Sequence, residues 1–337
     1  MKNTFFIAFC AIFTAIAAPA YSLTTHLYEK TEAQDSTLDV IGWFSKRDTV
    51  EYWINESQWK FHENDTVKTS DISTKVRLVI TDSTANGYKM DYTFLEFKGD
   101  SLGDSFQSNL QNSLIQKFGQ KIVGTTVHFE TNEYGMITNF TNLEEIREQS
   151  ESLYKATVKE LAEMPVTKML KEETGFDITK ISEKVSNDEL VESYIKELKL
   201  LFTCHGLSFN LGESYAHKDA TDGEYENDTY SNITCDNENG TYEIYSEVVN
   251  IIPKENLKAI VIATVGELFN EQITDSLNEA YDSGMGAYAT VTSYYIADYI
   301  YSGWPYKVVE QTTTDIGNDG KIELTYIYMD YISVDNY

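Results

Sequence analysis

Basic residues, cysteine and proline are scarce in this chain. Its 337 residues include 26 Lys and Arg against 54 Asp and Glu, so the formal net charge is −28. A surface this acidic repels phosphate groups, which argues against nucleic acid and anionic lipid headgroups as partners. Intrinsic disorder, the other explanation of high charge, is excluded by 42% hydrophobic content with 24 Tyr and 16 Phe.

Common signatures of catalysis and cofactor binding are also missing. The sequence contains no G-x-S-x-G, no phosphate loop and no G-x-G-x-x-G. Its 5 histidines are not spaced as a metal-binding pair. We therefore expect no metal or other cofactor, and we do not expect an enzyme. Because acids are so numerous, a hydrolase that uses a carboxylate pair stays open as the weakest alternative.

Only the N-terminus carries a long apolar run. Lys2 precedes 14 mostly apolar residues, 5–18, and small residues stand at Ala18 and Ala20 and again at Ala20 and Ser22. This pattern predicts a signal peptide over residues 1–20, cleaved after Ala20 or Ser22. The run is shorter than the ~20 residues that cross a bilayer, so we do not expect an integral membrane protein. We expect export to the periplasm or to the cell surface or extracellular space.

Two cysteines remain after cleavage of the signal peptide, Cys204 and Cys235. An even number in an exported protein predicts a disulfide, worth roughly 3–4 kcal/mol in the chain-entropy model. The stretch from Glu213 to Glu238 begins between the two cysteines, ends just after Cys235, and is strongly polar and acidic. Only the opening of a calcium loop occurs there, so we expect a solvated loop tethered by the disulfide rather than a calcium site.

Alternating and helical patterns together predict an α+β fold. Residues 76–81 and 88–97 form a predicted hairpin around Asn86-Gly87, and strands are also expected at 122–131, 136–140, 287–299, 306–314 and 322–334. Helical stripes occupy 106–118, 143–161, 190–201 and 257–282, and Thr141 with Glu144 predicts a capping box at the start of the second. Hairpin, helix and hairpin follow one another twice. We expect two halves, residues 23–165 and 166–337, in one continuous or two separate domains.

Two short stretches resemble a known family. Residues 129–139 end a strand, turn on Gly135 and lead into a helix, while Ser302-Gly303-Trp304-Pro305 precedes paired long strands. This arrangement resembles uncharacterised secreted bacterial proteins akin to the lipoprotein-carrier superfamily, which includes the outer-membrane lipoprotein localisation factor. The resemblance implies a strongly curved antiparallel sheet, a half-barrel, with helices on its concave side over an apolar cavity that holds acyl chains.

We therefore expect a non-catalytic protein that binds or carries an apolar, lipid-like ligand between the sheet and the helices. The candidate lining residues come from alternating strand positions, although ordinary core packing is the simpler explanation of each one. They are Met90, Tyr92, Phe94, Val127, Phe129, Tyr294 and Ile296. The main alternative is a structural or interaction protein of the cell surface with a protein partner, because the Tyr-rich strands suit contact surfaces.

Overall fold

The structure is a computed structural model that describes residues 37–63, 65–100, 116, 119–174, 179, 187–219, 225–258, 275, 288–317 and 319–334. The predicted signal peptide and most of the helices predicted over 106–118 and 257–282 lie outside the described residues. Within the described ranges, no helix combines the length and the hydropathy that a membrane span needs.

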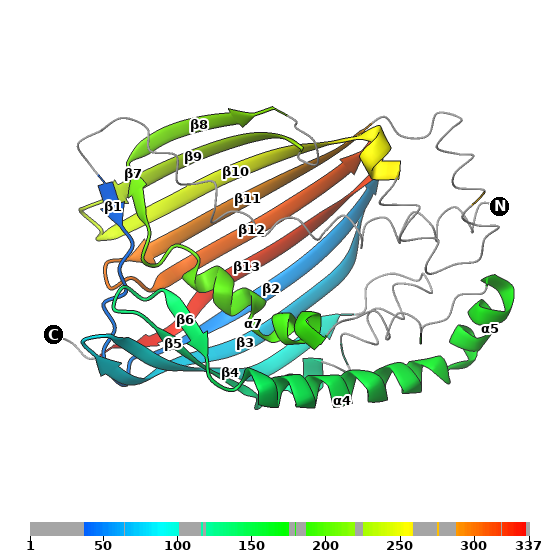
Figure 1. The fold of residues 1–337 in the computed structure, drawn as a ribbon, viewed down its shortest axis with the longest axis horizontal. Coiled ribbons are helices and arrows are strands. Elements are labelled where there is room, and N and C mark those ends of the chain that lie inside the picture. Colours follow the sequence, from blue (N-terminus) through cyan, green and yellow to red (C-terminus); the bar gives the residue numbers. More distant parts are fainter. Residues whose placement is uncertain are drawn as a thin grey trace.

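An antiparallel sheet of 11 strands dominates the described residues, in the order β6-β5-β4-β3-β2-β13-β12-β11-β10-β9-β8, with β6 and β8 at its two edges (Figure 1). Its first meander consists of β2 (Thr49–His62), β3 (Asp65–Thr84), β4 (Gly87–Asp100), β5 (Thr126–Thr131) and β6 (Ile137–Phe140). Its second meander consists of β8 (Gly212–Lys218), β9 (Glu226–Asp236), β10 (Thr241–Pro253), β11 (Tyr288–Ile300), β12 (Pro305–Ile316) and β13 (Asp319–Ser333).

The two meanders meet where the first strand of one pairs with the last strand of the other. Residues Thr49 to His62 of β2 run antiparallel to Asp319–Ser333 of β13. The predicted antiparallel strands and the Asn86-Gly87 hairpin are confirmed, and Gly87 adopts φ 138°, which favours glycine. A separate pair joins β1 (Thr37–Asp39) to β7 (Ser208–Asn210).

Helices are few among the described residues, so the fold is mostly β. They are α4 (Leu143–Ala162), α5 (Pro165–Thr174) and α7 (Asn187–Phe202). Helix α7 lies in front of the sheet and α4 runs along its β4 side (Figure 1). An Arg147 guanidinium nitrogen donates to a carboxylate oxygen of Asp188 over 2.9 Å, which joins α4 to α7. The face of the sheet that carries α7 is called the concave face below.

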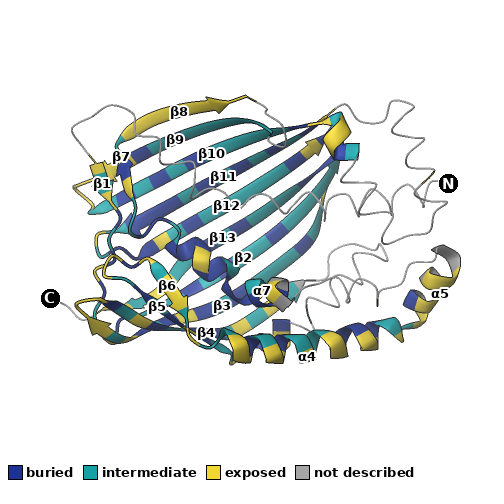
Figure 2. Ribbon diagram, viewed as in Figure 1, coloured by how far each residue is buried: buried dark blue, intermediate teal, exposed yellow. Residues whose placement is uncertain are grey.

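Burial alternates along the strands, as expected for a sheet with two different faces (Figure 2). Inward side chains of the sheet pack against α7 and against the segment around Phe44. Trp304 is fully buried there, and its ring lies 4.1 Å from that of Phe44. Gly303 makes this packing possible: with φ 82°, it brings its backbone so close to Ile41 that a Cβ would lie 2.2 Å from the Ile41 carbonyl oxygen.

The prediction of a loop at 213–238 was wrong, because most of these residues form strands. Residues 212–218 and 226–236 are strands β8 and β9, and β8 is exposed along its whole length at the edge of the sheet (Figure 2). An edge strand with solvent on both faces has no reason to alternate polar and apolar side chains, so it gave no strand signal. The Asp236 carboxylate accepts hydrogen bonds from the backbone of Glu238 and Asn239 in the turn after β9.

Candidate functional site

Five of the seven predicted lining residues lie together on the concave face, inside the packed core. They are Met90, Tyr92, Phe94, Val127 and Phe129, each at most 3% exposed. Side chains of α7 fill the space over them: the Phe94 ring meets that of Tyr194 at 6.0 Å, and the Phe129 ring meets that of Phe202 at 5.6 Å. This end of the concave face is therefore sealed by side chains rather than hollow.

The other two predicted lining residues face the opposite way. Tyr294 and Ile296 alternate along β11 with Tyr295 and Ala297, which are 2% and 0% exposed on the concave face. Neighbouring residues of a strand point to opposite faces, so Tyr294 and Ile296 lie on the convex face. The seven residues are not brought to one site. Both sets of alternate residues in β11 are rich in apolar side chains, so the alternation alone could not show which set faces the concave side.

Beyond the packed end, the concave face turns polar. Pairing across the sheet places Glu56 opposite Thr325, Thr325 opposite Glu310, and Glu310 opposite Tyr295, so all four side chains share one face. The next row shares that face as well. We call these polar residues the inner polar band: Ser246, Ser293, Thr312, Glu310, Thr325, Glu323, Gln58 and Glu56.

Solvent reaches part of this band from inside the curved sheet. Glu56, Gln58, Glu310, Thr312 and Glu323 are all half-buried, whereas the apolar row beside them is almost fully buried. In that apolar row Ile54, Ile327 and Val308 are 2%, 0% and 0% exposed. The concave face is thus closed at one end and accessible across its middle strands.

Charged groups in the band are balanced only in part. Lys321 donates to a carboxylate oxygen of Glu323 over 2.6 Å, and the amide of Gln58 donates to the same oxygen over 3.3 Å. Glu56 and Glu310 stand one row closer to the apolar end. Burial, with the negative charges of Glu323 and Glu56, raises the pKa of Glu310, although Lys196 on α7 lowers it.

Helix α7 adds a further carboxyl group above this row. Glu197 is only 8% exposed, one helical turn from Tyr194 and next to the fully buried Leu198. Burial, reinforced by the charge of Glu56, raises the pKa of Glu197 to about 8, so much of the group is protonated at neutral pH. Nothing in the sequence distinguishes Glu197 from any other glutamate on a helix, so the sequence did not predict it as a site residue.

Two buried hydroxyl groups on the concave face have no hydrogen-bond partner among the described residues. One is the Tyr92 hydroxyl, whose pKa is raised by burial and by the negative charges of Glu197 and Glu56. The other is the Ser246 hydroxyl, in the same transverse row as Glu310. A buried hydroxyl without a partner costs roughly 1–3 kcal/mol, so each is a position where an added polar group would be stabilised.

Apolar residues return at the far end of the concave face. Val291 follows the band on β11, where it pairs with Thr314, and Ile252 pairs with Ala289. Val291, Ile252 and Ala289 are 8%, 2% and 0% exposed. We call these three, with the 8%-exposed Ile316 of β12, the distal apolar patch. The concave face therefore runs from apolar to polar to apolar along its strands.

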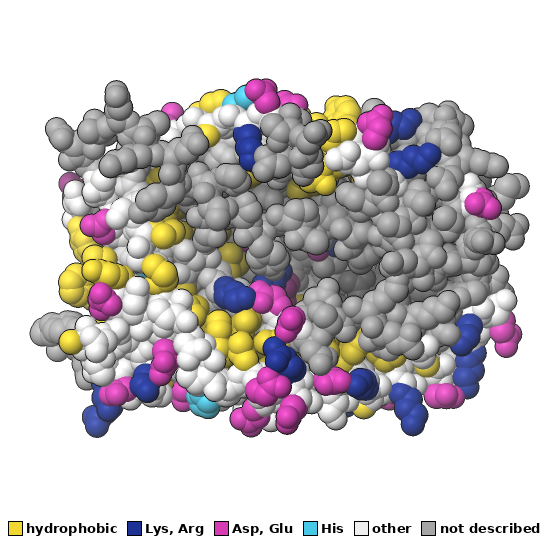
Figure 3. All heavy atoms as spheres, in the orientation of Figure 1, with side chains coloured by type: hydrophobic (Ala, Val, Ile, Leu, Met, Phe, Trp, Pro, Cys, Tyr) yellow, Lys and Arg dark blue, Asp and Glu magenta, His cyan; other side chains and the backbone are white. Residues whose placement is uncertain are grey.

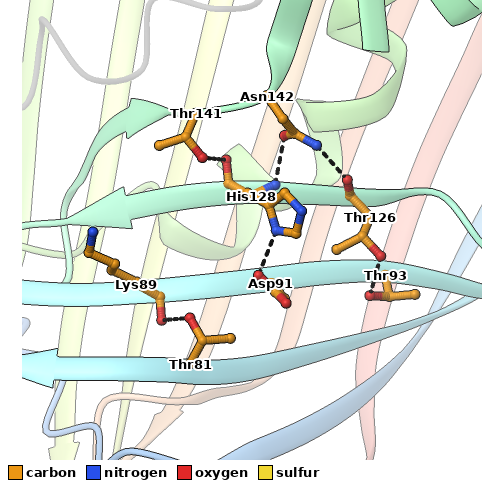
Figure 4. Close-up of polar contacts among 8 residues, drawn as sticks. All are labelled: Thr81, Lys89, Asp91, Thr93, Thr126, His128, Thr141 and Asn142. Atoms are coloured by element: carbon orange, nitrogen blue, oxygen red, sulfur yellow. Dashed lines mark hydrogen bonds and ion pairs between the residues drawn. The ribbon is translucent and has the colours of Figure 1, made fainter. Parts of the chain in front are cut away.

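A separate polar cleft of about 410 Å³ opens between β5 and the start of α4. His128 Nδ1 lies 2.7 Å from a carboxylate oxygen of Asp91, and Asn142 accepts from the backbone of His128 while its amide donates to Thr126 (Figure 4). Asn142 thus stands at the helix start in place of the predicted Thr141 capping box, and its side chain holds α4 to β5. Glu145 is the one carboxylate that lines this cleft, so the cleft lacks the facing pair that a glycosidase needs.

The predicted Cys204–Cys235 disulfide is not formed in this structure, where both cysteines are free. Cys204 is buried after α7, and its thiol donates to the Tyr295 hydroxyl over 3.6 Å. Cys235 is exposed near the end of β9, opposite Tyr242, whose ring stacks on that of Tyr299. The two thiols therefore occupy different environments, one in the core and one at the surface. No group of three or more His, Cys, Asp or Glu suited to a metal ion gathers within the described ranges.

Comparison with known proteins identifies no family. No family model matches the chain, and no curated sequence matches it, so the lipoprotein-carrier resemblance is not confirmed. A structure concerning lipid–protein interactions in lipovitellin has a TM-score of 0.40 at 10% identity, covering 87% of this chain and 26% of the other. The chain thus spans about a quarter of that protein.

Two bacterial structures are more distant. An outer-membrane channel from Pseudomonas putida F1 has a TM-score of 0.15 at 6% identity, covering 89% of this chain and 100% of the other. A porin-like protein from Bacteroides uniformis ATCC 8492 has a TM-score of 0.18 at 8% identity, covering 87% and 100%. Likeness this weak carries no functional argument, so the function has to be argued from the chain's own geometry.

Proposed function

We propose that the protein is a non-catalytic exported protein of the cell envelope that binds an apolar, lipid-like ligand against the concave face of its sheet. The observation that carries this proposal is the accessibility of the inner polar band. Glu56, Gln58 and Thr312 point inward from an open sheet and are nevertheless half-buried rather than sealed. Solvent therefore enters the curve of the sheet, and a ligand can replace it.

The order of surfaces on this face fits an amphipathic molecule better than a purely apolar one. A hydrocarbon chain would gain about 25 cal/mol for each Å² of apolar surface that it covers. The half-buried Val248, on the same face as the distal apolar patch, offers such surface, whereas the patch itself is at most 8% exposed. Polar atoms of the ligand would meet the inner polar band, where Ser246 keeps a hydroxyl without a partner. The sealed end, with Phe94 and Phe129, would form the floor of the site rather than its lining.

Export from the cytoplasm, which the N-terminal pattern predicts, is compatible with a ligand-binding role in the cell envelope. The N-terminal pattern of Lys2 and the apolar run 5–18 is that of a signal peptide. Lipid-like molecules are sparingly soluble in water, so a binding protein that shields their chains suits transfer across an aqueous compartment of the envelope. The high negative charge would keep such a protein in solution.

Native mass spectrometry and solvent extraction of protein purified from its own host test the proposal. A matched pair of variants sharpens the test, because Thr312 points inward and its neighbour Thr313 points outward from the same strand. We expect wild type and Thr313→Trp to carry a ligand and Thr312→Trp to lose most of it. Repeated recovery of bare polypeptide from wild type would refute the proposal.

The convex face supports a second candidate, a surface module that binds another protein. Half-buried tyrosines gather on that face, where the rings of Tyr230 and Tyr245 lie 5.8 Å apart and those of Tyr326 and Tyr328 lie 5.6 Å apart. Tyrosine offers a large contact area with a polar tip. Replacing Tyr245 and Tyr326 by Ser should abolish surface attachment if this candidate holds, and should leave ligand occupancy unchanged if the first one does.

A further inference from the structure

The carboxyl groups of the concave face define the polar end of the proposed ligand. We propose that Glu56, Glu197 and Glu310 form a head-group site for an amphiphile with a positively charged amine. The inference rests on the proposed function and deepens it, because it names the chemistry of the ligand rather than its mere presence. It follows from the arrangement of three acids beside the orphan hydroxyl of Tyr92, and from the half-buried side chains next to them on the same face.

Sheet register and helix position bring the three acids to one region. Glu56 and Glu310 pair with the same residue, Thr325, from either side, so their backbones lie roughly 10 Å apart on one face. Helix α7 crosses this face, and the charge of Glu56 acts on Glu197 strongly enough to raise its pKa. An ammonium group is small enough to sit between carboxylates at such a separation.

Electrostatics select the sign of the ligand's charge. Charges of Glu56 and Glu310 both raise the pKa of Glu197, and that of Glu56 raises the pKa of Glu310. Lys196 opposes these effects but does not cancel them, since both pKa values stay above their usual range. A cation that enters this region gains attraction from each acid at reduced dielectric, whereas a carboxylate or phosphate head group would be repelled.

The orphan hydroxyl of Tyr92 points independently to an absent polar partner. Tyr92 is fully buried, its hydroxyl has no hydrogen-bond partner, and the charges of Glu197 and Glu56 both act on it. Ser246 on β10 also has a hydroxyl without a partner, but it lies two strands from Glu310 and six strands from Tyr92, so it stands outside the head-group site. Hydroxyl oxygens accept hydrogen bonds, and an ammonium group has only N–H donors to offer them.

The half-buried Val248 and Thr312, in the next row of the same face, leave one direction for the rest of the molecule. The distal apolar patch begins at Val291, two residues along β11 from Ser293 of the inner polar band. A chain attached to the ammonium group can follow the strands in that direction, since the other direction is blocked by the packed core around Tyr194 and Phe94. Each strand residue advances it by about 3.3 Å, so a chain of ~10–12 carbons spans several residues.

The affinity of such a ligand should depend on pH. Groups that face Glu197 are Glu56 on β2, Tyr92 on β4, Glu310 on β12 and Lys196 on its own helix; the Lys321–Glu323 ion pair on β13 adds little net charge nearby. Because Glu197 is protonated below a pKa of about 8, cation binding should strengthen as pH rises through that value. A permanently charged trimethylammonium head isolates this effect from titration of the ligand.

Titration calorimetry with four twelve-carbon probes tests the inference: dodecylamine, dodecyltrimethylammonium, dodecanol and dodecanoate, each below its micelle concentration. We expect both cations to bind at least about tenfold more tightly than dodecanoate at pH 7, a difference of about 1.4 kcal/mol. Glu310→Gln should reduce that preference about fivefold or more at pH 7, and Glu197→Gln should do so at pH 9, above the Glu197 pKa of about 8. Both variants should leave dodecanol binding unchanged. Ethylammonium, which lacks the chain, should not bind measurably.

A matched control separates this site from the general acidity of the protein. Glu192 lies on the same helix but pairs with Lys199, so Glu192→Gln should keep the full preference. Equal affinity for dodecanoate and the cations, or a preference that survives both Glu197→Gln and Glu310→Gln, would overturn the head-group site while leaving apolar binding intact. Failure of all four probes to bind would instead overturn the proposed function itself.

Discussion

The replacement Glu197→Gln should stabilise the protein, and by more at high pH than at low pH. Glu197 is 8% exposed, and its pKa is raised from 4.5 to about 8. A carboxyl group whose pKa is higher in the folded state weakens folding progressively as pH rises from the unfolded value to the folded one. At low pH the group is protonated in both states, so its effect vanishes there.

The magnitude follows from the size of the shift. Between pH 4.5 and pH 7 lie 2.5 units, and each unit of pKa difference corresponds to 1.36 kcal/mol, so Glu197 costs about 3 kcal/mol at pH 7. Glutamine keeps the shape of the side chain without its charge. We expect Glu197→Gln to gain about 3 kcal/mol at pH 7, about 4.5 kcal/mol at pH 8.5, and almost nothing at pH 4.

Urea unfolding of both proteins at pH 4, 7 and 8.5 measures this effect. The control is Glu192→Gln, which removes an exposed ion pair with Lys199 on the same helix and should change stability by less than about 1 kcal/mol. A pH-independent difference between Glu197→Gln and wild type, or a loss of stability at pH 7, would show that Glu197 is not a desolvated acid on the concave face.

Three further predictions concern the packed end of the concave face. Trp304→Ala should cost about 3–5 kcal/mol in urea unfolding, because Trp304 is fully buried against Phe44, and a loss below 1 kcal/mol would contradict the packing. Burial raises the pKa of Cys204 to about 11, so a thiol reagent should label one cysteine, Cys235, in the folded state and two after unfolding; two unreactive thiols would indicate a disulfide instead. Burial lowers the pKa of His205 to about 4, so stability should fall as pH drops from 6.5 towards 4, and His205→Gln should flatten that dependence.

The strands could be predicted because each satisfies a local rule. Tyr88, Met90, Tyr92 and Phe94 alternate with polar residues, and Asn86-Gly87 supplies a turn with positive φ, so the β3–β4 hairpin was confirmed. The helices predicted at 143–161 and 190–201 from their helical apolar stripes were confirmed as α4 and α7. Long-range order was not accessible, because the pairing of β2 with β13 joins residues more than 250 positions apart.

The candidate site could be predicted only in part. Alternation placed Phe94 and Phe129 on the inner face, but it could not distinguish a packed floor from an open lining. Tyr294 and Ile296 lie on the convex face. The prediction chose them because both sets of alternate residues in β11 are apolar enough to face inward. The inner polar band escaped notice because its Ser, Thr and Glu side chains have the pattern of a solvated face, and only the curvature of the sheet turns that face inward.

Acidic side chains are visible on the surface as well as inside. Asp and Glu gather along the α4 side of the face in view, interspersed with Lys and Arg (Figure 3). Some of these groups form exposed ion pairs, such as Arg147 with Glu144 and Lys155 with Glu151. Pairs of this kind contribute at most about 1 kcal/mol each, so the charge of this surface acts on solubility more than on stability.

Mapping the residues that a bound ligand contacts is the most direct test of the claim that the concave face binds an apolar ligand. A twelve-carbon amine that carries a photoactivatable diazirine in its chain, irradiated on the protein and mapped by peptide mass spectrometry, reports that contact. The account predicts adducts on the half-buried inward positions Gln58, Val248, Glu310 and Thr312. Adducts confined to convex-face positions such as Tyr245 and Thr313, or no adduct competed by unlabelled amine, would contradict it.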